Sequence, residues 1–334
     1  MKDRFFRGGI LVAVGGLLLA ALSGTGYASP GDADATSHRA ATSAGEQLRI
    51  EQYWTAERMN GAVPMRQLLR HTYQPKGTVQ SKATVAAGEP TRIPPTAATT
   101  GKAPVTVMSF PNDGEAWTGG GLIVKTEGRV FFTYQGRNAS CSGTAVTSTN
   151  KSTVITAGHC VKLDGAWHTN WAFVPAYDNG NKPYGTWTAR KTFATPQWVA
   201  SEDINYDVGA AAVNQLNGQH LTDAVGGQGV AFNQARNQAM YAFGYPAASP
   251  YDGSKLIYCS GNTFDAFISD GIGMTCDMTG GSSGGGWFLS FSESTGAGTV
   301  NSVNSYKINF FSFWMFGPYF GTDAQNVYNT AQAA

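Results

Sequence analysis

A serine in a run of glycines is the first candidate for chemistry in this sequence. Residues Gly280–Gly285 read Gly-Gly-Ser-Ser-Gly-Gly, and glycine lets a backbone bend sharply and turn its N–H groups towards open space. Acyl transfer needs an exposed nucleophilic hydroxyl and donors for the oxyanion. We therefore predict Ser283 as the nucleophile and the N–H groups of Gly281 and Ser283 as an oxyanion hole, although most glycine and serine runs are flexible loops.

A base and an orienting acid for that serine occur earlier in the chain. His159 follows the strand-like run Thr153–Ile155 and precedes Cys160, so a strand end and a disulfide could both fix its loop. Asp207 stands just before a run of small apolar residues. A buried acid there requires a partner, which an imidazole N–H supplies. We predict His159 as the general base and Asp207 as its orienting acid, with Asp203 as the nearby competitor.

The glycine-rich motif also fits a second class of hydrolase. Residues Gly281–Gly285 satisfy the G-x-S-x-G pattern of the α/β-hydrolases. That fold places its catalytic histidine after the serine in the chain, whereas no histidine follows His220 here. The sequence also lacks the alternating helices of that fold, so this class is excluded.

The three motifs together resemble those of the chymotrypsin-like (trypsin-like) serine peptidases, in particular the bacterial secreted branch with trypsin-like and glutamyl-endopeptidase-like enzymes. They are T-A-G-H-C at Thr156–Cys160, D-V-G at Asp207–Gly209 and G-S-S-G-G at Gly281–Gly285, in the family's order. The resemblance spans about residues 120–332. It implies an all-β fold of two six-stranded antiparallel β-barrels with the site between them. It also implies hydrolysis of peptide bonds through an acyl-enzyme, with no metal or organic cofactor.

Two positions depart from the family pattern. Ser282 stands where the animal digestive enzymes carry an aspartate that binds the newly freed N-terminus. Removal of a pro-segment should therefore act here by another route. Gly286 stands where related bacterial sequences often have proline. A secreted binding protein that keeps the barrels but has lost turnover is the alternative function, and labelling by a serine-directed phosphonate distinguishes the two.

Three residues are candidates for substrate binding. Asp277 lies six residues before Ser283, the position that forms the floor of the primary specificity pocket in trypsin-like enzymes. An acid there would select Lys or Arg, but the side chain could equally turn towards solvent. Met278 could narrow such a pocket, and Ser305 lies in a run, Ser302–Tyr306, that resembles the strand against which the family pairs the substrate backbone. The histidine that glutamyl endopeptidases place after the nucleophile is absent, which argues against strict Glu specificity.

The four cysteines allow three pairings. Sequential pairing closes two short loops, whereas a zinc site would need a tighter cluster such as C-x-x-C. We therefore predict the disulfides Cys141–Cys160 and Cys259–Cys276.

Composition and local patterns favour a β-rich extracellular protein. Of 334 residues, 42 are glycine and 13% are charged, and the net charge of +1 gives no reason to expect a nucleic-acid partner. Short runs such as Arg129–Tyr134 and Trp171–Val174, separated by turn residues, predict an all-β barrel or sandwich. A capping-box pattern of Thr322 and Gln325 predicts a terminal helix over Asp323–Gln332.

The front of the chain is predicted to be removed. Met1–Ala28 has the basic start, apolar middle and small-residue end of a signal peptide, and its apolar run is shorter than the roughly 20 residues of a membrane span. We therefore expect a secreted monomer with no membrane anchor. Residues 29–103 are predicted as pro-segment and linker, and residues 104–334 as the peptidase domain.

The pro-segment is predicted to contain one short helix and a linker. A capping box of Ser43 and Glu46 opens the helix, and Gly61 is a plausible stop. The proline-rich residues 77–104 are predicted to be an exposed linker, with removal somewhere between about residues 77 and 120. Residues 29–102 carry 9 Lys/Arg against 6 Asp/Glu, and residues 103–334 carry 11 against 15. Opposite charge would let the pro-segment dock on the peptidase as an intramolecular partner.

Overall fold

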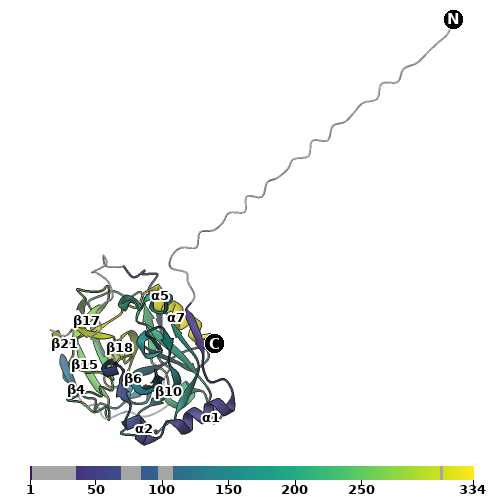
Figure 1. The fold of residues 1–334 in the computed structure, drawn as a ribbon. Coiled ribbons are helices and arrows are strands. Elements are labelled where there is room, and N and C mark those ends of the chain that lie inside the picture. Colours follow the sequence, from purple (N-terminus) through teal and green to yellow (C-terminus); the bar gives the residue numbers. More distant parts are fainter. Residues whose placement is uncertain (2–34, 69–83, 97–107, 309–310) are drawn as a thin grey trace.

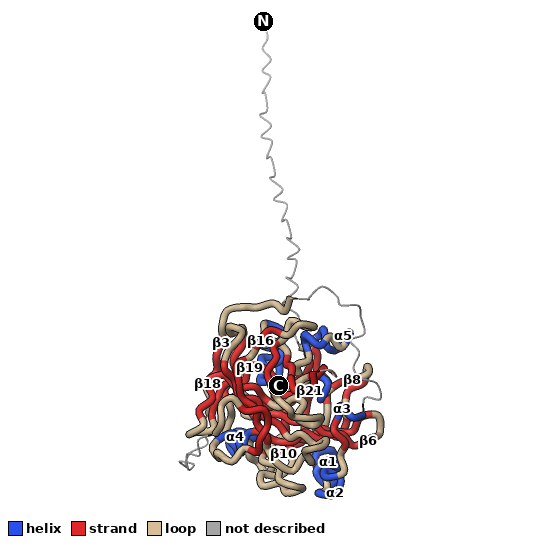
Figure 2. The backbone as a smooth tube through the Cα atoms, turned by 90° about the vertical axis from the view of Figure 1, so that its left-hand side faces the viewer, coloured by secondary structure: helices blue, strands red, loops and turns tan. Residues whose placement is uncertain are grey.

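The computed structural model describes Met1 and residues 35–68, 84–96, 108–308 and 311–334. The predicted signal peptide, apart from Met1, lies outside these residues, as do parts of the predicted linker. The described chain is mostly β-structure in two neighbouring strand systems, with short helices on the outside (Figures 1 and 2). Within these ranges, no helix combines the length and apolarity needed to span a membrane.

The first strand system is a closed barrel of six antiparallel strands. Its order is β11–β10–β5–β6–β7–β12, and β12 pairs back with β11 to close the ring. Large apolar side chains such as Phe131 and Phe173 are fully buried, and so are their neighbours Phe132 and Val174, because both faces of these strands are covered. The strands are β5 (Glu127–Tyr134), β6 (Arg137–Val146), β7 (Thr153–Thr156), β10 (Thr169–Pro175), β11 (Trp187–Ala194) and β12 (Gly209–Val213).

The second strand system follows in the chain and lies beside the first. A seven-stranded sheet has the order β3–β13–β19–β18–β14–β15–β4, and a four-stranded sheet has the order β16–β17–β21–β20. The strands are β3 (Thr91–Ile93), β4 (Asn112–Ala116), β13 (Gly229–Phe232), β14 (Ala239–Gly244), β15 (Ile257–Asn262), β16 (Phe264–Asp265), β17 (Ile272–Thr275), β18 (Gly286–Ser292), β19 (Ala297–Val303), β20 (Tyr306–Ile308) and β21 (Phe311–Gly317). This all-β architecture with a terminal helix confirms the predicted fold class.

Short elements join the strands. A two-stranded ribbon of β8 (Lys162–Leu163) and β9 (Ala166–Trp167) follows the histidine motif. The helices of this part are α4 (Leu122–Thr126), η1 (Gly158–Cys160), α5 (Pro196–Ser201), η2 (Ile204–Tyr206), α6 (Leu221–Val225) and α7 (Thr322–Gln332).

The terminal helix α7 forms as predicted, but its capping box does not. Gly321 is the N-cap, and no side chain caps the helix. The amide of Gln325 instead bonds to Asn233 at 3.0 Å and Thr91 at 3.3 Å. A tertiary contact therefore competes successfully with the local cap.

The N-terminal segment packs against the first barrel (Figure 1). Strand β1 (Thr36–Arg39) pairs antiparallel with β11, and β2 (Val63–Pro64) pairs parallel with β6. Between them lie the helices α1 (Ala44–Tyr53) and α2 (Ala56–Asn60), and α3 (Met65–Leu68) follows β2. The predicted capping box of Ser43 and Glu46 opens α1, while Gly61 caps α2, so two helices form where one was expected.

The part of the predicted linker that the structure describes is not an exposed spacer. Strand β3, which lies within residues 77–104, pairs antiparallel with β13. Thr96 forms a further bridge with Gly227, and the Val85 side chain is buried. The expectation of an unstructured linker is therefore wrong for residues 84–96, because β3 pairs with the edge of the second sheet and the N–H groups of Val85 and Gly88 bond to side chains.

Candidate active site

The pairing of β7 with β12 brings the predicted base and acid together. The two strands are antiparallel, with Gly209 opposite Thr156. The end of β7 and the start of β12 therefore lie at the same edge of the barrel. His159 stands three residues beyond Thr156 in η1, and Asp207 stands two residues before Gly209. Register between two distant segments thus places the imidazole beside the carboxylate.

Asp207 is bound to both the side chain and the backbone of His159. Its Oδ2 lies 2.8 Å from His159 Nδ1, and its Oδ1 accepts the His159 backbone N–H at 2.8 Å. Both side chains are buried. The competitor Asp203 caps η2 and bonds to Asn205 instead. The geometry therefore brings Asp207, and not Asp203, to the imidazole.

Ser305 is a third member of this hydrogen-bond network. Its hydroxyl donates to Asp207 Oδ2 at 2.5 Å. Burial alone would raise the pKa of Asp207, but His159 and the Ser305 hydroxyl hold that pKa below its usual value. The carboxylate is therefore kept ionised, and it favours a proton on His159 Nδ1. The sequence suggested Ser305 only as a substrate-binding candidate.

The glycine-rich loop is held in a conformation that leaves two of its amides without an acceptor among the described residues. Gly281 has φ +100° and Gly284 has φ +82°, values that favour glycine. Ser142 fixes the loop, because its N–H donates to Ser283 O at 2.7 Å and its hydroxyl donates to Gly281 O at 2.9 Å. The N–H groups of Gly281 and Ser283 have no acceptor among the described residues. No sequence signal pointed to Ser142.

Ser283 lies close to the disulfide that follows the histidine. Its carbonyl oxygen is 3.7 Å from Cys160 Sγ. The Ser283 side chain is 5% exposed, and in the described part of the chain its hydroxyl makes no hydrogen bond to His159. The structure thus brings the serine loop to the histidine loop without closing the last bond of a triad.

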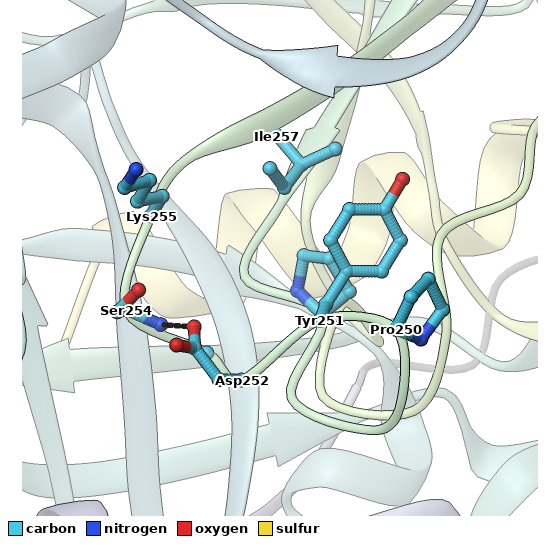
Figure 3. Close-up of a pocket in the computed structure, with 8 residues that line it drawn as sticks. Pro250, Tyr251, Asp252, Ser254, Lys255 and Ile257 are labelled. Carbon is cyan, nitrogen blue, oxygen red and sulfur yellow. Dashed lines mark hydrogen bonds between the residues drawn. The ribbon is translucent and has the colours of Figure 1, made fainter.

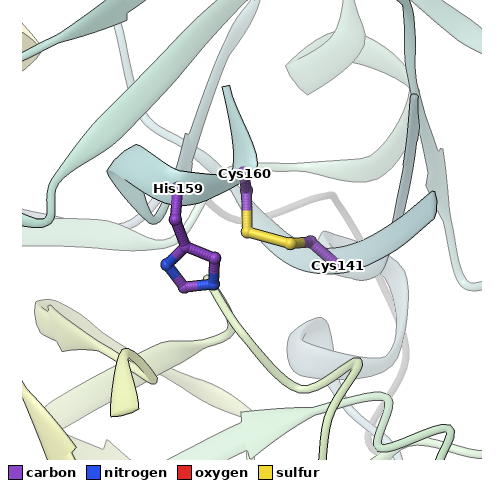
Figure 4. A group of neighbouring side chains, drawn as sticks. All are labelled: Cys141, His159 and Cys160. Carbon is purple, nitrogen blue, oxygen red and sulfur yellow. A yellow bond between two sulfur atoms is a disulfide. The ribbon is translucent and has the colours of Figure 1, made fainter. Parts of the chain in front are cut away.

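Both predicted disulfides form. Cys141 is bonded to Cys160 at 2.03 Å, and Cys259 to Cys276 at 2.07 Å. Cys141, His159 and Cys160 also form the one group of potential metal ligands that lie close together in the described ranges (Figure 4). The sulfur atoms of the two cysteines are bonded to each other, so neither cysteine can serve as a thiolate ligand. The disulfide instead ties Cys160, and with it the histidine loop, to Cys141 in β6.

The three candidates for substrate binding have different environments. Asp277 is exposed, and its Oδ1 accepts the Tyr251 hydroxyl at 2.5 Å. Met278 is fully buried in the core around the Cys259–Cys276 disulfide. Ser305 lies on Asp207, as described above. Of these three residues, only Asp277 is thus open to solvent, and no pattern in the sequence indicated its partner Tyr251.

Tyr251 also lines a small pocket of about 170 Å³ on the loop between β14 and β15 (Figure 3). The loop is tied to the segment before the serine, because the Thr279 hydroxyl donates to Ala248 O and the Ala247 N–H donates to Gly280 O. The pocket contains neither His159 nor Ser283. Its lining residues are Pro246, Pro250, Tyr251, Asp252, Gly253, Ser254, Lys255 and Ile257.

Known structures identify the fold and the family. The crystal structure of protease Anisep from Arthrobacter nicotinovorans is 48% identical, and 100% of its chain aligns with 66% of this one at a TM-score of 0.62. This chain belongs to the bacterial chymotrypsin-like serine proteases. The thermostable serine protease AL20 from an extremophilic microorganism is 39% identical over 64% of this protease and 99% of its own chain, with a TM-score of 0.61. A Glu endopeptidase with 14% identity and a TM-score of 0.53 shares the fold.

Sequence comparisons cover less of this protease. The extracellular metalloprotease of Bacillus subtilis (strain 168) is 37% identical over 75 residues, which are 22% of this chain and 23% of the relative. The match thus spans about a quarter of that curated relative. No family model matches the chain.

Proposed function

We propose that this serine protease is a secreted endopeptidase that cleaves peptide bonds with His159, Asp207 and Ser283. Ser283 Oγ attacks the substrate carbonyl while His159 Nε2 takes its proton, and the N–H groups of Gly281 and Ser283 hold the oxyanion. His159 then protonates the leaving amine. Water, activated by the same imidazole, hydrolyses the acyl-enzyme. Asp207 and Ser305 keep the imidazole oriented throughout.

One observation carries this proposal. The buried carboxylate of Asp207 holds His159 Nδ1 at 2.8 Å, and the Ser283 loop, which contacts the neighbouring Cys160, has two N–H groups without an acceptor among the described residues. Hydrogen bonds between nucleophile and base often shorten only when substrate binds. We therefore expect the Ser283–His159 hydrogen bond to form when substrate binds. The two disulfides support export to an oxidising compartment.

Replacement of single serines tests the nucleophile. Ser283→Ala should lower kcat by several orders of magnitude and leave folding intact, because only the attacking oxygen is lost. Ser282→Ala is the matched control, since its hydroxyl bonds to Thr279 O at 2.8 Å. We expect the control to keep kcat within about tenfold. Full activity of Ser283→Ala would refute the triad, and the reverse ranking would move the nucleophile to Ser282.

Covalent labelling tests the alternative function. A serine-directed phosphonate should label Ser283 stoichiometrically in the mature enzyme. A folded protein that binds peptides but is neither labelled nor catalytically active would be a binding module with a peptidase fold.

We propose that Asp277 contributes to the selection of Lys or Arg beside the cleaved bond. Its carboxylate is exposed and is oriented by the Tyr251 hydroxyl. Asp277→Asn should lower the preference for basic residues at least about tenfold in a peptide library, because it removes the charge but keeps the shape. Unchanged preference would assign specificity elsewhere. Met278 would act only through the packing behind Asp277.

We also propose that residues 29–103 are a pro-segment that is removed between about residues 77 and 120. Trp54, Met59 and Met65 are fully buried and belong to the same core as the first barrel. None of the ion pairs among the described residues joins residues 35–68 to the remainder. Apolar burial and backbone pairing, rather than opposite charge, therefore support docking. N-terminal sequencing of the secreted enzyme tests removal, and a fully active enzyme that begins at Ser29 would refute it.

A further inference from the structure

Glu127, the first residue of β5, is a buried acid that the proposed reaction does not use. Its exposed fraction is 0%. Its Oε1 accepts the Gly286 N–H at 3.1 Å and also the hydroxyl of Thr144, its cross-strand neighbour in β6. Its Oε2 has no hydrogen-bond partner in the described part of the chain. Burial of a carboxyl group costs free energy unless the group is hydrogen-bonded. The bonds to Gly286 and Thr144 therefore indicate the role of Glu127.

The bond to Gly286 joins the first barrel to the nucleophile loop. Gly286 begins β18 in the second sheet and stands three residues after Ser283. From the second sheet, Asn304 holds the loop through its backbone N–H to Gly285 O and its side chain to Ser282 O. From the first barrel, only Ser142 and Glu127 among the residues described above bond to this loop. Glu127 therefore fixes the C-terminal end of the nucleophile loop relative to the first barrel.

Gly286 explains why this chain needs such an acceptor. A proline at this position would have no N–H, whereas Gly286 has one that needs an acceptor. Here a Cβ on residue 286 would lie 2.8 Å from Thr144 Oγ1 and 2.9 Å from the Phe288 ring, so the site has little room for a side chain. A buried N–H without an acceptor loses its hydrogen bonds to water without replacement, which destabilises the conformation that buries it. The Glu127 carboxyl supplies that acceptor.

The surroundings favour the neutral form of Glu127. Burial raises its pKa to about 8, although the bonds from Thr144 and Gly286 act in the opposite direction. Two ionisable groups pack nearby, Tyr245 after β14 and Arg129 on the same face of β5. Burial raises the pKa of Tyr245, which stays neutral, and the Arg129 guanidinium bonds to Ser140. No described cation pairs with Glu127.

We propose that Glu127 is a positioning residue that anchors Gly286 and thereby holds the Ser283 loop beside the histidine loop. Ionisation would leave a buried negative charge on Oε2 with no partner among the described residues. Because the cost of burial outweighs the two bonds, the ionised side chain should move towards water and release Gly286, so kcat should fall at alkaline pH while KM changes little. The inference rests on the proposed role of Ser283 as the nucleophile.

The pH dependence of kcat in three Glu127 and Thr144 variants tests the anchor. Wild type should lose kcat above about pH 8. E127Q keeps an acceptor but cannot ionise, so it should retain most of kcat at pH 7 and lose the alkaline decline. E127L leaves the Gly286 N–H without an acceptor and should lower kcat at least about tenfold at every pH, with KM within about threefold. T144V removes a bond that lowers the pKa of Glu127, so the decline should move to higher pH.

Asp323→Asn is the matched control, because Asp323 is another buried acid, and it accepts a hydrogen bond from Gln197 of α5 and none from the nucleophile loop. It should keep the alkaline decline. Superimposable pH profiles of wild type, E127Q and T144V would overturn the inference even if E127L does not fold. An inactive Ser283→Ala variant together with such profiles would refute only the role of Glu127, whereas an active Ser283→Ala variant would refute the proposed nucleophile itself.

Discussion

Trp54→Ala should detach the N-terminal segment from the first barrel. The Trp54 side chain is 0% exposed, its ring centroid lies 5.4 Å from that of Phe131, and its indole N–H donates to Asn170 O at 2.7 Å. Truncation of a buried tryptophan costs about 3–5 kcal/mol. The unpaired Asn170 carbonyl adds to that loss, so we expect the free energy of unfolding of the precursor to fall by about 4 kcal/mol or more.

The assay is urea unfolding of the uncleaved precursor, monitored by circular dichroism. All variants carry Ser283→Ala, which prevents self-cleavage. Leu48→Ala is the matched control, because Leu48 lies on the same helix, α1, but is 54% exposed. A surface change of this kind should alter the free energy of unfolding by about 0.5 kcal/mol at most. Added protease should also trim the segment faster in Trp54→Ala. A loss under about 1 kcal/mol, or equal effects of both variants, would refute the docking of the segment through Trp54.

Three further predictions follow from the site and the core. Ser305→Ala removes a hydrogen bond to a charged carboxylate, worth about 1.5–3 kcal/mol, so steady-state kinetics should show kcat/KM lower by roughly 10- to 100-fold; an unchanged value would limit Ser305 to a structural role. Burial lowers the pKa of His168 from 6.5 to about 3, so the native protein binds fewer protons than the unfolded chain below pH 6.5. Stability should therefore fall as pH drops from 6.5 towards 3, and urea titrations of His168→Gln should show a smaller fall. Replacement of both Cys259 and Cys276 by alanine should lower the free energy of unfolding by about 3 kcal/mol, and an unchanged thermal midpoint would contradict this.

The sequence predicted features that depend on neighbouring residues. The Ser43 and Glu46 capping box, the strand ending at Thr156 and the helix over the last residues are local patterns, and each forms. The glycines around Ser283 likewise indicated a special backbone, and Gly281 and Gly284 have positive φ. Sequential pairing of the cysteines was also correct, because each pair closes a short loop. Turn and cap preferences act over a few residues, so a single sequence carries them.

Only the tertiary structure decided which distant groups meet. The choice of Asp207 over Asp203 depends on the register of β12 against β7, and the contact of Ser305 with Asp207 joins residues 98 positions apart. The Thr322 and Gln325 cap failed because Gln325 has a partner at Asn233, a competitor that no local pattern reveals. Glu127 and Trp54 look ordinary in the sequence. Their roles arise from burial, which depends on the whole fold. Every segment packed around a residue contributes to the free-energy cost of leaving a buried polar group unpaired or a cavity in the core.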